Sequence, residues 1–283
     1  MRSTLVLRQA TITDLSRLSN FLTASPRLHR HLDWRPPLEW LGQQPFWLAE
    51  QDNLIGAALA IPADPPGIAW VRLFACAAGV NPIDAWEQLF NRCLEDPALD
   101  TRTILPSLAL SDWYASILRR SGFEHHQDIV GLEREVEFES ANLTSNPDLF
   151  VRLMEPDDLP VVATIDQAAF EPIWQNSLHQ VEQSYEQAGI ATVAEWDEGI
   201  VGFQISTINM FAAHLARLAV MPGLQGRKVG TTLLHDLVQR CRTDRLWQIT
   251  INTQDDNYAS LALYRKVGFK LSGEHFPVFV YSG

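Results

Sequence analysis

Segment 218–234, LAVMPGLQGRKVGTTLL, constrains the fold most, because an apolar strand runs through a glycine-bearing turn into an amphipathic helix. The free N–H groups in the first turn of such a helix point outward at its positive end, where they can bind pyrophosphate oxygens. An ordinary strand, turn and helix with a basic first turn is the alternative interpretation.

The turn has the composition of an anion site. Gly226 and Gly230 let the backbone approach a ligand closely, while Arg227 and Lys228 add positive charge. The spacing excludes both the phosphate loop of ATPases and the G-x-G-x-x-G loop that binds dinucleotides. The sequence therefore predicts a phosphate-binding turn of another type.

Residues 225–230, QGRKVG, resemble the [QR]-x-x-G-x-[GA] signature of the GNAT superfamily of acetyl-CoA-dependent N-acetyltransferases. Lys228 stands where that family usually has its middle glycine. A second segment, 257–269, NYASLALYRKVGF, is similar to the closing motif of the family, N-x-x-A-x-x-L-Y-x-x-x-G-F. By the order and separation of the two motifs, segment 150–283 is identified as a member of this superfamily.

The resemblance implies that acetyl-CoA is the co-substrate. The backbone at the end of the strand would pair with its pantetheine arm, and the turn would bind its diphosphate. Asn257 would touch the same molecule, although a helix N-cap is an equally good physical role for it. The residues implied as the acetyl-CoA site are Leu218, Ala219, Val220, Gln225, Gly226, Arg227, Lys228, Val229, Gly230, Thr231, Asn257 and Tyr264.

Three residues are candidates for proton transfer. The resemblance implies that Tyr264 donates a proton to the departing thiolate, and a merely buried tyrosine is the alternative. An amine is protonated at pH 7, so a base or a water chain must remove a proton before attack. His214 lies eleven positions before Gln225, where histone-modifying relatives have their base, and imidazole titrates in a suitable range. Glu195 is the second candidate base.

The acceptor is expected beside the loop that follows the first helix of this half. Phe170, Glu171 and Trp174 are the predicted substrate contacts. The implied reaction is transfer of acetyl to a primary amine, of a small molecule or a protein, by direct attack in a ternary complex. A longer acyl-CoA, an O-acceptor, or a non-catalytic CoA-binding regulatory protein are the alternatives.

The length of 283 residues and the internal repetition predict two domains. Arg8 precedes Asp14 as Arg152 precedes Asp158, with strand-like patterns around each. The expected fold class is α+β (mixed α/β), with two tandem GNAT-like domains, each a twisted, mostly antiparallel mixed sheet flanked by helices. The expected boundaries are a GNAT-like domain over 1–138, a polar linker over 139–149 and a catalytic domain over 150–283.

The first half lacks the groups that carry chemistry in the second. Segment 76–85, CAAGVNPIDA, has no Gln or Arg at the first signature position and no basic charge. Leu118 takes the place of Tyr264 when the two Gly-Phe pairs are aligned. Residues 1–138 are therefore predicted to form a degenerate domain that packs against or orients the active half.

Charge and cysteines limit the remaining possibilities. With 34 acidic and 22 basic residues the formal charge is −12, which argues against nucleic-acid binding and favours cationic partners such as amines. The 3 cysteines are far apart without metal spacing, so we expect no metal and a reducing, cytoplasmic environment. No apolar run reaches membrane-spanning length, so no membrane association is expected. The sequence leaves the oligomeric state open.

Overall fold

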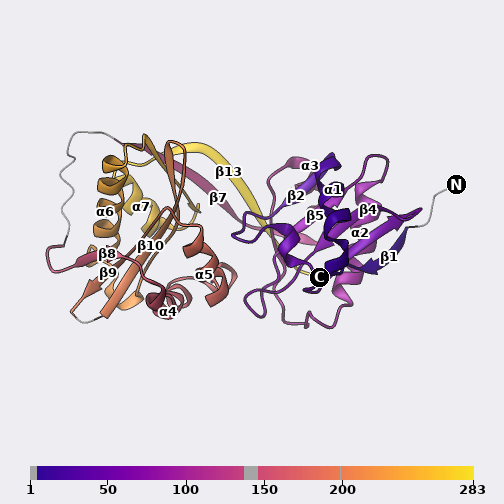
Figure 1. The fold of residues 1–283 in the computed structure, drawn as a ribbon, viewed down its shortest axis with the longest axis horizontal. Coiled ribbons are helices and arrows are strands. Elements are labelled where there is room, and N and C mark those ends of the chain that lie inside the picture. Colours follow the sequence, from indigo (N-terminus) through magenta and orange to yellow (C-terminus); the bar gives the residue numbers. More distant parts are fainter. Residues whose placement is uncertain (1–4, 137–145, 198) are drawn as a thin grey trace. The chain divides into compact units, whose positions relative to one another are not determined.

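A computed structural model describes residues 5–136, 146–197 and 199–283 (Figure 1). The chain forms two compact units. Unit 1 consists of the chain up to His126 together with Phe276–Gly283, and unit 2 consists of Gln127–His275. Each unit has a largely antiparallel sheet flanked by helices, so the predicted mixed α/β class is confirmed.

Unit 1 contains a five-stranded sheet in the order β1-β3-β4-β5-β2. Its elements are β1 (Val6–Gln9), η1 (Ile12–Asp14), α1 (Leu15–Ala24), β2 (Arg27–Arg30), η2 (Pro37–Trp40), β3 (Phe46–Gln51), β4 (Leu54–Ala60), β5 (Leu73–Cys76), α2 (Pro82–Leu94), β6 (Pro106–Leu108) and α3 (Asp112–Arg120). Strands β3 and β4 form a hairpin, whose turn carries Asp52 and Asn53 at positive φ.

Unit 2 contains the strand order β7-β12-β11-β10-β9-β8, in which only the β11·β12 pair is parallel. Its elements are β8 (Phe150–Leu153), η3 (Pro156–Asp158), α4 (Leu159–Ala169), η4 (Pro172–Trp174), α5 (Leu178–Glu186), β9 (Ile190–Trp196), β10 (Gly199–Asn209), β11 (Ala212–Val220), η5 (Pro222–Leu224), α6 (Val229–Thr243), β12 (Gln248–Gln254) and α7 (Tyr258–Lys266).

Two long strands, β7 (Phe123–Glu135) and β13 (Lys270–Tyr281), each run from one unit into the other. In unit 2, Ile129–Glu135 of β7 pairs with β12. In unit 1, Val278–Val280 of β13 pairs with β6. Each unit therefore contains strand residues from the other half of the sequence, and β6, β13 and β7 continue the eight-stranded sheet that includes β12 to β8.

The compact units differ from the predicted boundaries for this reason. The described end of the predicted first domain, 127–136, belongs to unit 2, while 276–283 at the end of the predicted second domain belongs to unit 1. A polar composition locates a connection between halves, but it does not show which sheet the flanking strands join. Most of the predicted linker, 139–145, lies outside the described residues.

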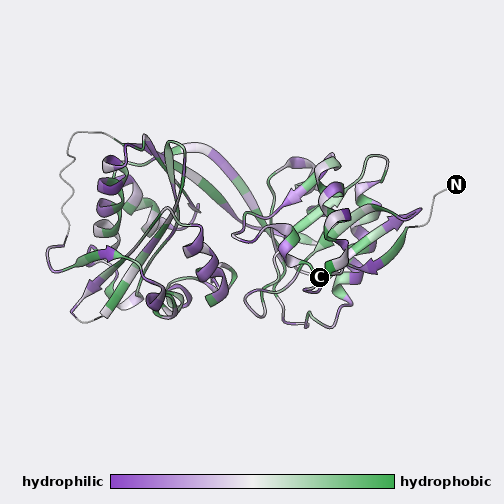
Figure 2. Ribbon diagram, in the orientation of Figure 1, coloured by the Kyte–Doolittle hydropathy of each residue, from purple (hydrophilic) through white to green (hydrophobic). Residues whose placement is uncertain are grey.

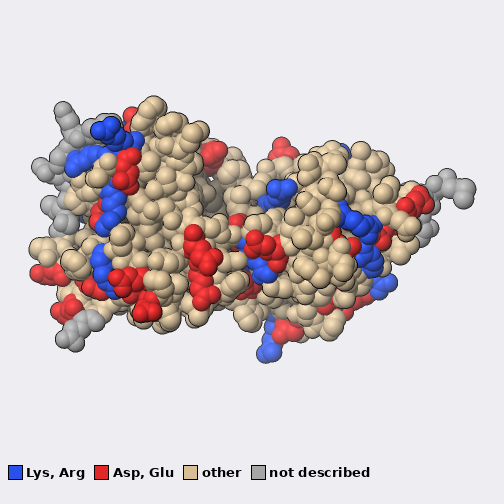
Figure 3. All heavy atoms as spheres, in the orientation of Figure 1, with Lys and Arg blue, Asp and Glu red and all other residues tan. Residues whose placement is uncertain are grey.

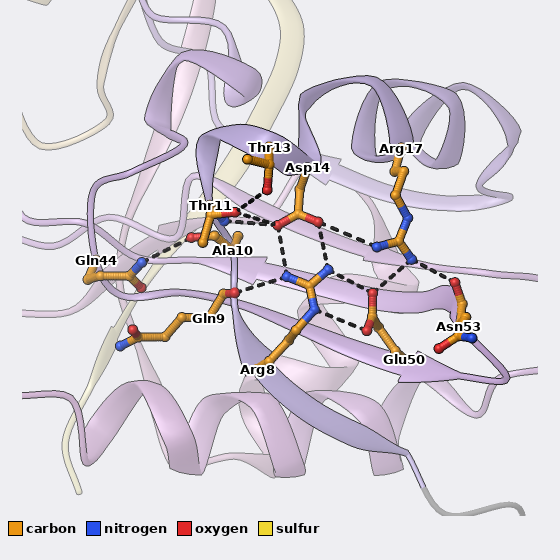
Figure 4. A network of polar contacts seen from close by, with 10 residues as sticks. All are labelled: Arg8, Gln9, Ala10, Thr11, Thr13, Asp14, Arg17, Gln44, Glu50 and Asn53. Carbon is orange, nitrogen blue, oxygen red and sulfur yellow. Dashed lines mark hydrogen bonds and ion pairs between the residues drawn. The ribbon is translucent and has the colours of Figure 1, made fainter.

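An ion-pair network repeats in the two units and supports the duplication. In unit 1, Arg8 donates to both carboxylate oxygens of Asp14, at 2.8 and 2.6 Å, and to Glu50 (Figure 4). In unit 2, Arg152 binds Asp158 and Glu195 in the same way. Each arginine thus ties the first strand of its unit to the start of the following helix.

The sheet of unit 2 has a helix layer on each face. Leu234 and Leu237 of α6 and Leu261 of α7 pack with the buried side chains of β11 and β12 on one face. Helix α4 packs against β10 and β11 on the other face. Figure 2 shows hydrophobic and hydrophilic residues alternating along these elements, as expected where one side of a strand or helix is buried.

Candidate functional site

Strands β11 and β12 separate half way along β11. Their parallel pairing ends at Leu215 and Ile251, whereas β11 continues to Val220. A bulge at Ala216, against β10, marks the point of separation. Within the described ranges, residues 216–220 pair with no strand on the side that β12 has left. One edge of β11 is therefore open over this stretch.

The direction of the peptide groups shows which residues face the open edge. The N–H of Met221 donates to the carbonyl of Val201 in β10, at 2.9 Å. Because peptide groups alternate in direction along a strand, those of Val220 and Leu218 point away from β10 and into the opening. Ala219 was also a predicted contact, but its peptide groups face β10. The carbonyl of Val220 accepts a hydrogen bond of 3.4 Å from Nε2 of Gln225. An extended ligand arm would therefore pair with Leu218 directly, and with Val220 in place of this contact.

The open edge leads into an exposed turn before α6. Gly226 and Lys228 have left-handed backbones, with φ of +78° and +66°. A left-handed residue beside a right-handed one aims successive N–H groups at one point, which is the geometry of an anion nest. Lys228 occupies the position that is usually glycine in the GNAT signature, and its positive φ explains that preference. The lysine maintains the turn at an energetic cost of about 1 kcal/mol.

The N-terminus of α6 is uncapped. Lys228 is the N-cap residue, and its side chain makes no capping hydrogen bond. The first three helical N–H groups, of Val229, Gly230 and Thr231, have no acceptor within the helix. Their partial positive charge adds to that of Arg227, whose guanidinium lies 5.5 Å from the Trp196 ring centroid. The predicted diphosphate site is therefore geometrically possible here.

Gly230 has a packing role in addition to the predicted one. A Cβ at this position would lie 3.0 Å from Cδ2 of Leu263 in α7. A Cβ at Gly226 would meet no atom within 4 Å. Gly230 is thus required for the close approach of α6 and α7, whereas Gly226 is required for its backbone conformation.

Helix α7 begins at Asn257 and carries Tyr264 into the protein. The Asn257 side chain accepts a hydrogen bond from the N–H of Ser260, so it is an N-cap. Tyr264 is 5% exposed and packs among apolar side chains that include Leu215 and Phe269. Burial raises the pKa of Tyr264 to about 12, against the effects of a Ser260 hydrogen bond and the Arg217 charge. The phenol is therefore neutral at pH 7 and holds a proton.

His214 lies on the opposite face of the sheet from Tyr264. Its neighbour Leu215 packs on the α6 and α7 face, so the alternation of β11 directs His214 towards α4. Nδ1 of His214 is 2.8 Å from Oγ1 of Thr250. Burial lowers the pKa of His214 below its usual 6.5, so the imidazole is neutral at pH 7 and able to accept a proton.

Glu195, the second candidate base, is held in the repeated ion-pair network. Its carboxylate accepts a hydrogen bond of 2.8 Å from Nε of Arg152. Glu50 has the same relation to Arg8 in unit 1. Because the arrangement occurs in both halves, it gives Glu195 a structural role, and its role as a base stays a prediction.

Sequence reasoning missed a buried ion pair that anchors the predicted acceptor loop. Arg217 of β11 donates to both oxygens of Asp166 in α4, at 2.6 and 2.7 Å. It also donates to the carbonyl of Trp174, and its guanidinium lies 3.6 Å from the Phe170 ring centroid. Glu171 is exposed. The signal was an arginine inside an apolar strand and an aspartate on the apolar face of a helix.

In unit 1, the strand edge that corresponds to the open edge of β11 is paired with another strand of the same unit. Residues 73–76 of β5 pair with β4 as residues 217–220 of β11 pair with β10. In unit 1, however, β2 pairs antiparallel with this stretch of β5. His29 of β2 is buried, lies 3.1 Å through Nε2 from the carbonyl of Val71, and stacks on Tyr114 at 3.9 Å. The chain itself occupies the position where a ligand arm would pair.

The helix that follows β5, α2, has a side-chain N-cap. The side chain of Asn81 accepts a hydrogen bond from the N–H of Ile83, at 3.0 Å, and Pro82 has no N–H to donate. Unit 1 thus presents neither an open edge nor an uncapped helix at the equivalent positions.

Charges and possible metal ligands add little to this site. Figure 3 shows acidic and basic side chains in small adjacent groups on the face drawn. Among the described residues, no group of three or more His, Cys, Asp or Glu side chains could hold a metal ion. In the same residues, no helix combines the length and the hydropathy needed to cross a bilayer.

Comparison with known proteins agrees with this geometry. The acetyltransferase (GNAT) family description matches residues 159–269. The ribosomal protein bS18-alanine N-acetyltransferase of Salmonella typhimurium is 26% identical over 119 residues, which are 42% of this chain and 79% of that protein.

Solved structures share the fold over almost the whole chain. A tandem GNAT protein from the clavulanic acid biosynthesis pathway aligns with a TM-score of 0.64 and 13% identity, covering 98% of both chains. A GCN5-related N-acetyltransferase from Kribbella flavida aligns with a TM-score of 0.70 and 14% identity, covering 98% of this chain and 70% of that one.

The acetyltransferase family match over 159–269 identifies an acyltransferase, and the open strand edge that leads into an uncapped helix lies within the matched residues. Residues 159–269 match the GNAT family of acetyltransferases, and the chain as a whole shares the fold of a tandem GNAT protein.

Proposed function

We propose that unit 2 transfers an acetyl group from acetyl-CoA to a primary amine by direct attack in a ternary complex. The observation that carries the proposal is the continuity of the open β11 edge with the uncapped N-terminus of α6. Leu218 and Val220 would pair with the pantetheine arm through their peptide groups. Residues 225–231 would bind the diphosphate through main-chain N–H groups.

Two side chains suit the two proton transfers of the reaction, from the amine and to the thiolate. His214, neutral at pH 7, would take a proton from the amine, directly or through water. The neutral amine nitrogen then bonds to the acyl carbon as the carbon–sulfur bond breaks, and the nitrogen loses its second proton to water. Tyr264, also neutral, would donate a proton or a hydrogen bond to the thiolate. A base on one face of the sheet and an acid on the other fit a thioester held at the edge between them.

The amine would lie beside the loop 170–176, with Phe170, Glu171 and Trp174 as its contacts. This loop is pinned to the open strand through Arg217, so a bound amine would approach the edge from the face that carries His214. The similarity to an alanine N-acetyltransferase makes a peptide N-terminus a reasonable acceptor to test.

The proposal is tested by acetyl-CoA binding and by release of free thiol with a panel of amines. The panel includes a peptide with N-terminal alanine, a polyamine, an amino sugar and an amino acid amide. We expect binding by calorimetry and amine-dependent thiol release. Binding without release from any amine would contradict the enzyme, and absence of binding would contradict the site.

A matched pair of glycine variants tests the turn. Gly226→Val places a side chain at positive φ and should weaken acetyl-CoA binding, because the N–H groups of the turn are re-aimed. Gly223→Val lies in the same exposed connection without positive φ and has open space around its Cβ, so it should bind normally. Equal affinities would exclude the turn as the diphosphate site. These substitutions avoid the packing clash that any larger residue at Gly230 would cause.

A further inference from the structure

The ion pair between Asp166 of α4 and Arg217 of β11 does more than join the helix to the sheet. The Asp166 side chain is 0% exposed and that of Arg217 is 14% exposed. Removing two charges from water is unfavourable, and apolar side chains of similar volume often hold such elements together equally well. A buried pair does, however, impose direction, because its hydrogen bonds are satisfied in one arrangement only.

The direction imposed here is that of the loop 170–176. The N–H of Asn176 donates to Oδ1 of Asp166, at 2.8 Å. Arg217 donates to the carbonyl of Trp174 and covers the ring of Phe170. Asp166 and Arg217 therefore each form a hydrogen bond to the backbone of the loop as well as to each other.

Arg217 also belongs to the open edge. It is the first residue after the bulge at Ala216, where β11 has left β12. The next residue, Leu218, has its peptide groups directed into the opening. Arg217 therefore connects the loop 170–176 to the strand that would hold the thioester.

Unit 1 shows what the same fold does without this pair. The offset between Arg8 and Arg152 and between Asp14 and Asp158 is 144 residues, and applying it to Asp166 and Arg217 gives Leu22 and Leu73. Both leucines are buried in one apolar cluster, so helix and sheet still pack. The chain after α1 is then free to form β2, which closes the edge of β5.

We propose that Asp166 and Arg217 are positioning residues that hold the loop 170–176 off the open edge and align the amine with the thioester. The role of the loop in binding the amine rests on the proposed function above. The pair touches neither reacting atom, and it acts through the loop.

The apolar pair of unit 1 supplies the decisive variant. Asp166→Leu combined with Arg217→Leu should fold, because unit 1 packs with leucines at both positions. We expect the KM for the most active amine of the panel to rise by about tenfold or more, since misplacement by about 1 Å reduces rates strongly. The dissociation constant of acetyl-CoA should change by no more than about twofold.

Two further variants separate positioning from general destabilisation. Arg217→Lys keeps the charge but loses the bidentate contact, and it should raise the amine KM by a smaller factor. Asp236→Leu combined with Arg240→Leu removes an ion pair of α6 that does not touch the loop, and it should leave the amine KM unchanged. The proposal is overturned if the Asp166 and Arg217 variant keeps the wild-type KM, or if amine and acetyl-CoA affinities fall in parallel.

Hydrogen exchange makes the test independent of the amine. With acetyl-CoA bound, the amides of 170–176 should exchange faster in the double leucine variant than in the wild type, because the N–H of Asn176 has lost its acceptor. Unchanged exchange would overturn the proposal. Failure of every amine with the wild-type protein, in contrast, would overturn the proposed function alone.

Discussion

The two units differ in the hydrogen bonding of an equivalent strand and helix. In unit 2 the edge of β11 is open and α6 begins without a side-chain cap. In unit 1 β2 pairs with the corresponding edge, and Asn81 caps the corresponding helix. Backbone groups that are satisfied within the chain are not available to a ligand. In the proposed site, binding would depend on main-chain groups that no strand and no cap occupies among the described residues.

The largest expected effect comes from separating the halves. Fragments 1–138 and 150–283, expressed alone, should fail to give a cooperative melt, because each unit then loses a strand supplied by the other half. Circular dichroism against temperature measures this. The two fragments expressed together serve as the control and should recover the transition. A cooperative melt with acetyl-CoA binding by 150–283 alone would show that the crossed strands are dispensable.

Tyr264→Phe should lower turnover by about 100-fold with acetyl-CoA affinity unchanged, because the ring is kept and the proton donor is lost. Stopped-flow thiol release and calorimetry give the two values. Leu118→Tyr places the same side chain at the corresponding position of unit 1 and should add no activity, since β2 still fills the edge. Unaltered turnover in the first variant would remove Tyr264 from the mechanism.

His214→Gln should lower kcat/KM at pH 7 by about tenfold, since water can replace part of the function of a base. Burial depresses the pKa of His214, so the wild-type rate should fall only below the usual 6.5, where the imidazole becomes protonated. The variant should lack this acid limb in a pH profile. An identical limb in both proteins would assign the titration to another group.

Strand β2, which pairs with the edge of β5, should make the stability of unit 1 depend on pH. Burial lowers the pKa of His29 to about 4, so between the usual 6.5 and that value the unfolded chain binds more protons than the folded one. Stability therefore decreases as the pH falls through this window. Melting curves should show a smaller decrease for His29→Phe. His179→Phe removes an exposed histidine as the control and should match the wild type.

The smallest expected effect is at the turn of unit 2. Lys228→Gly relieves a left-handed backbone and should raise the melting temperature by about 2–4 °C. Arg245→Gly relieves another positive φ, of 57°, away from the turn and should give a similar gain. A lower melting temperature for Lys228→Gly alone would show that the lysine side chain stabilises the turn.

Motifs with a local cause were predictable from sequence. The glycine-bearing turn and the amphipathic pattern in 218–234 indicated α6, and Asn257 was expected as a possible N-cap of the helix that became α7. The duplication was also visible, because Arg8 and Arg152 lie at matching distances from their aspartates. These features depend on contacts within one helix or between neighbouring elements.

Residues defined by distant contacts were not predictable in the same way. Asp166 and Arg217 are 51 residues apart, and neither has a motif of its own. The contact of Glu195 with Arg152, 43 residues away, was not predicted. Nor was the packing of Gly230 against Leu263 of another helix.

The sequence by itself determined the family resemblance, the duplication and the location of the turn, because these follow from short-range spacing of residue types. Tertiary structure alone decided which peptide groups remain open, since an edge is open only if no other strand reaches it. It also decided the division of the chain, because β7 and β13 each cross from one compact unit to the other. Strand pairing is a long-range choice that local sequence does not specify.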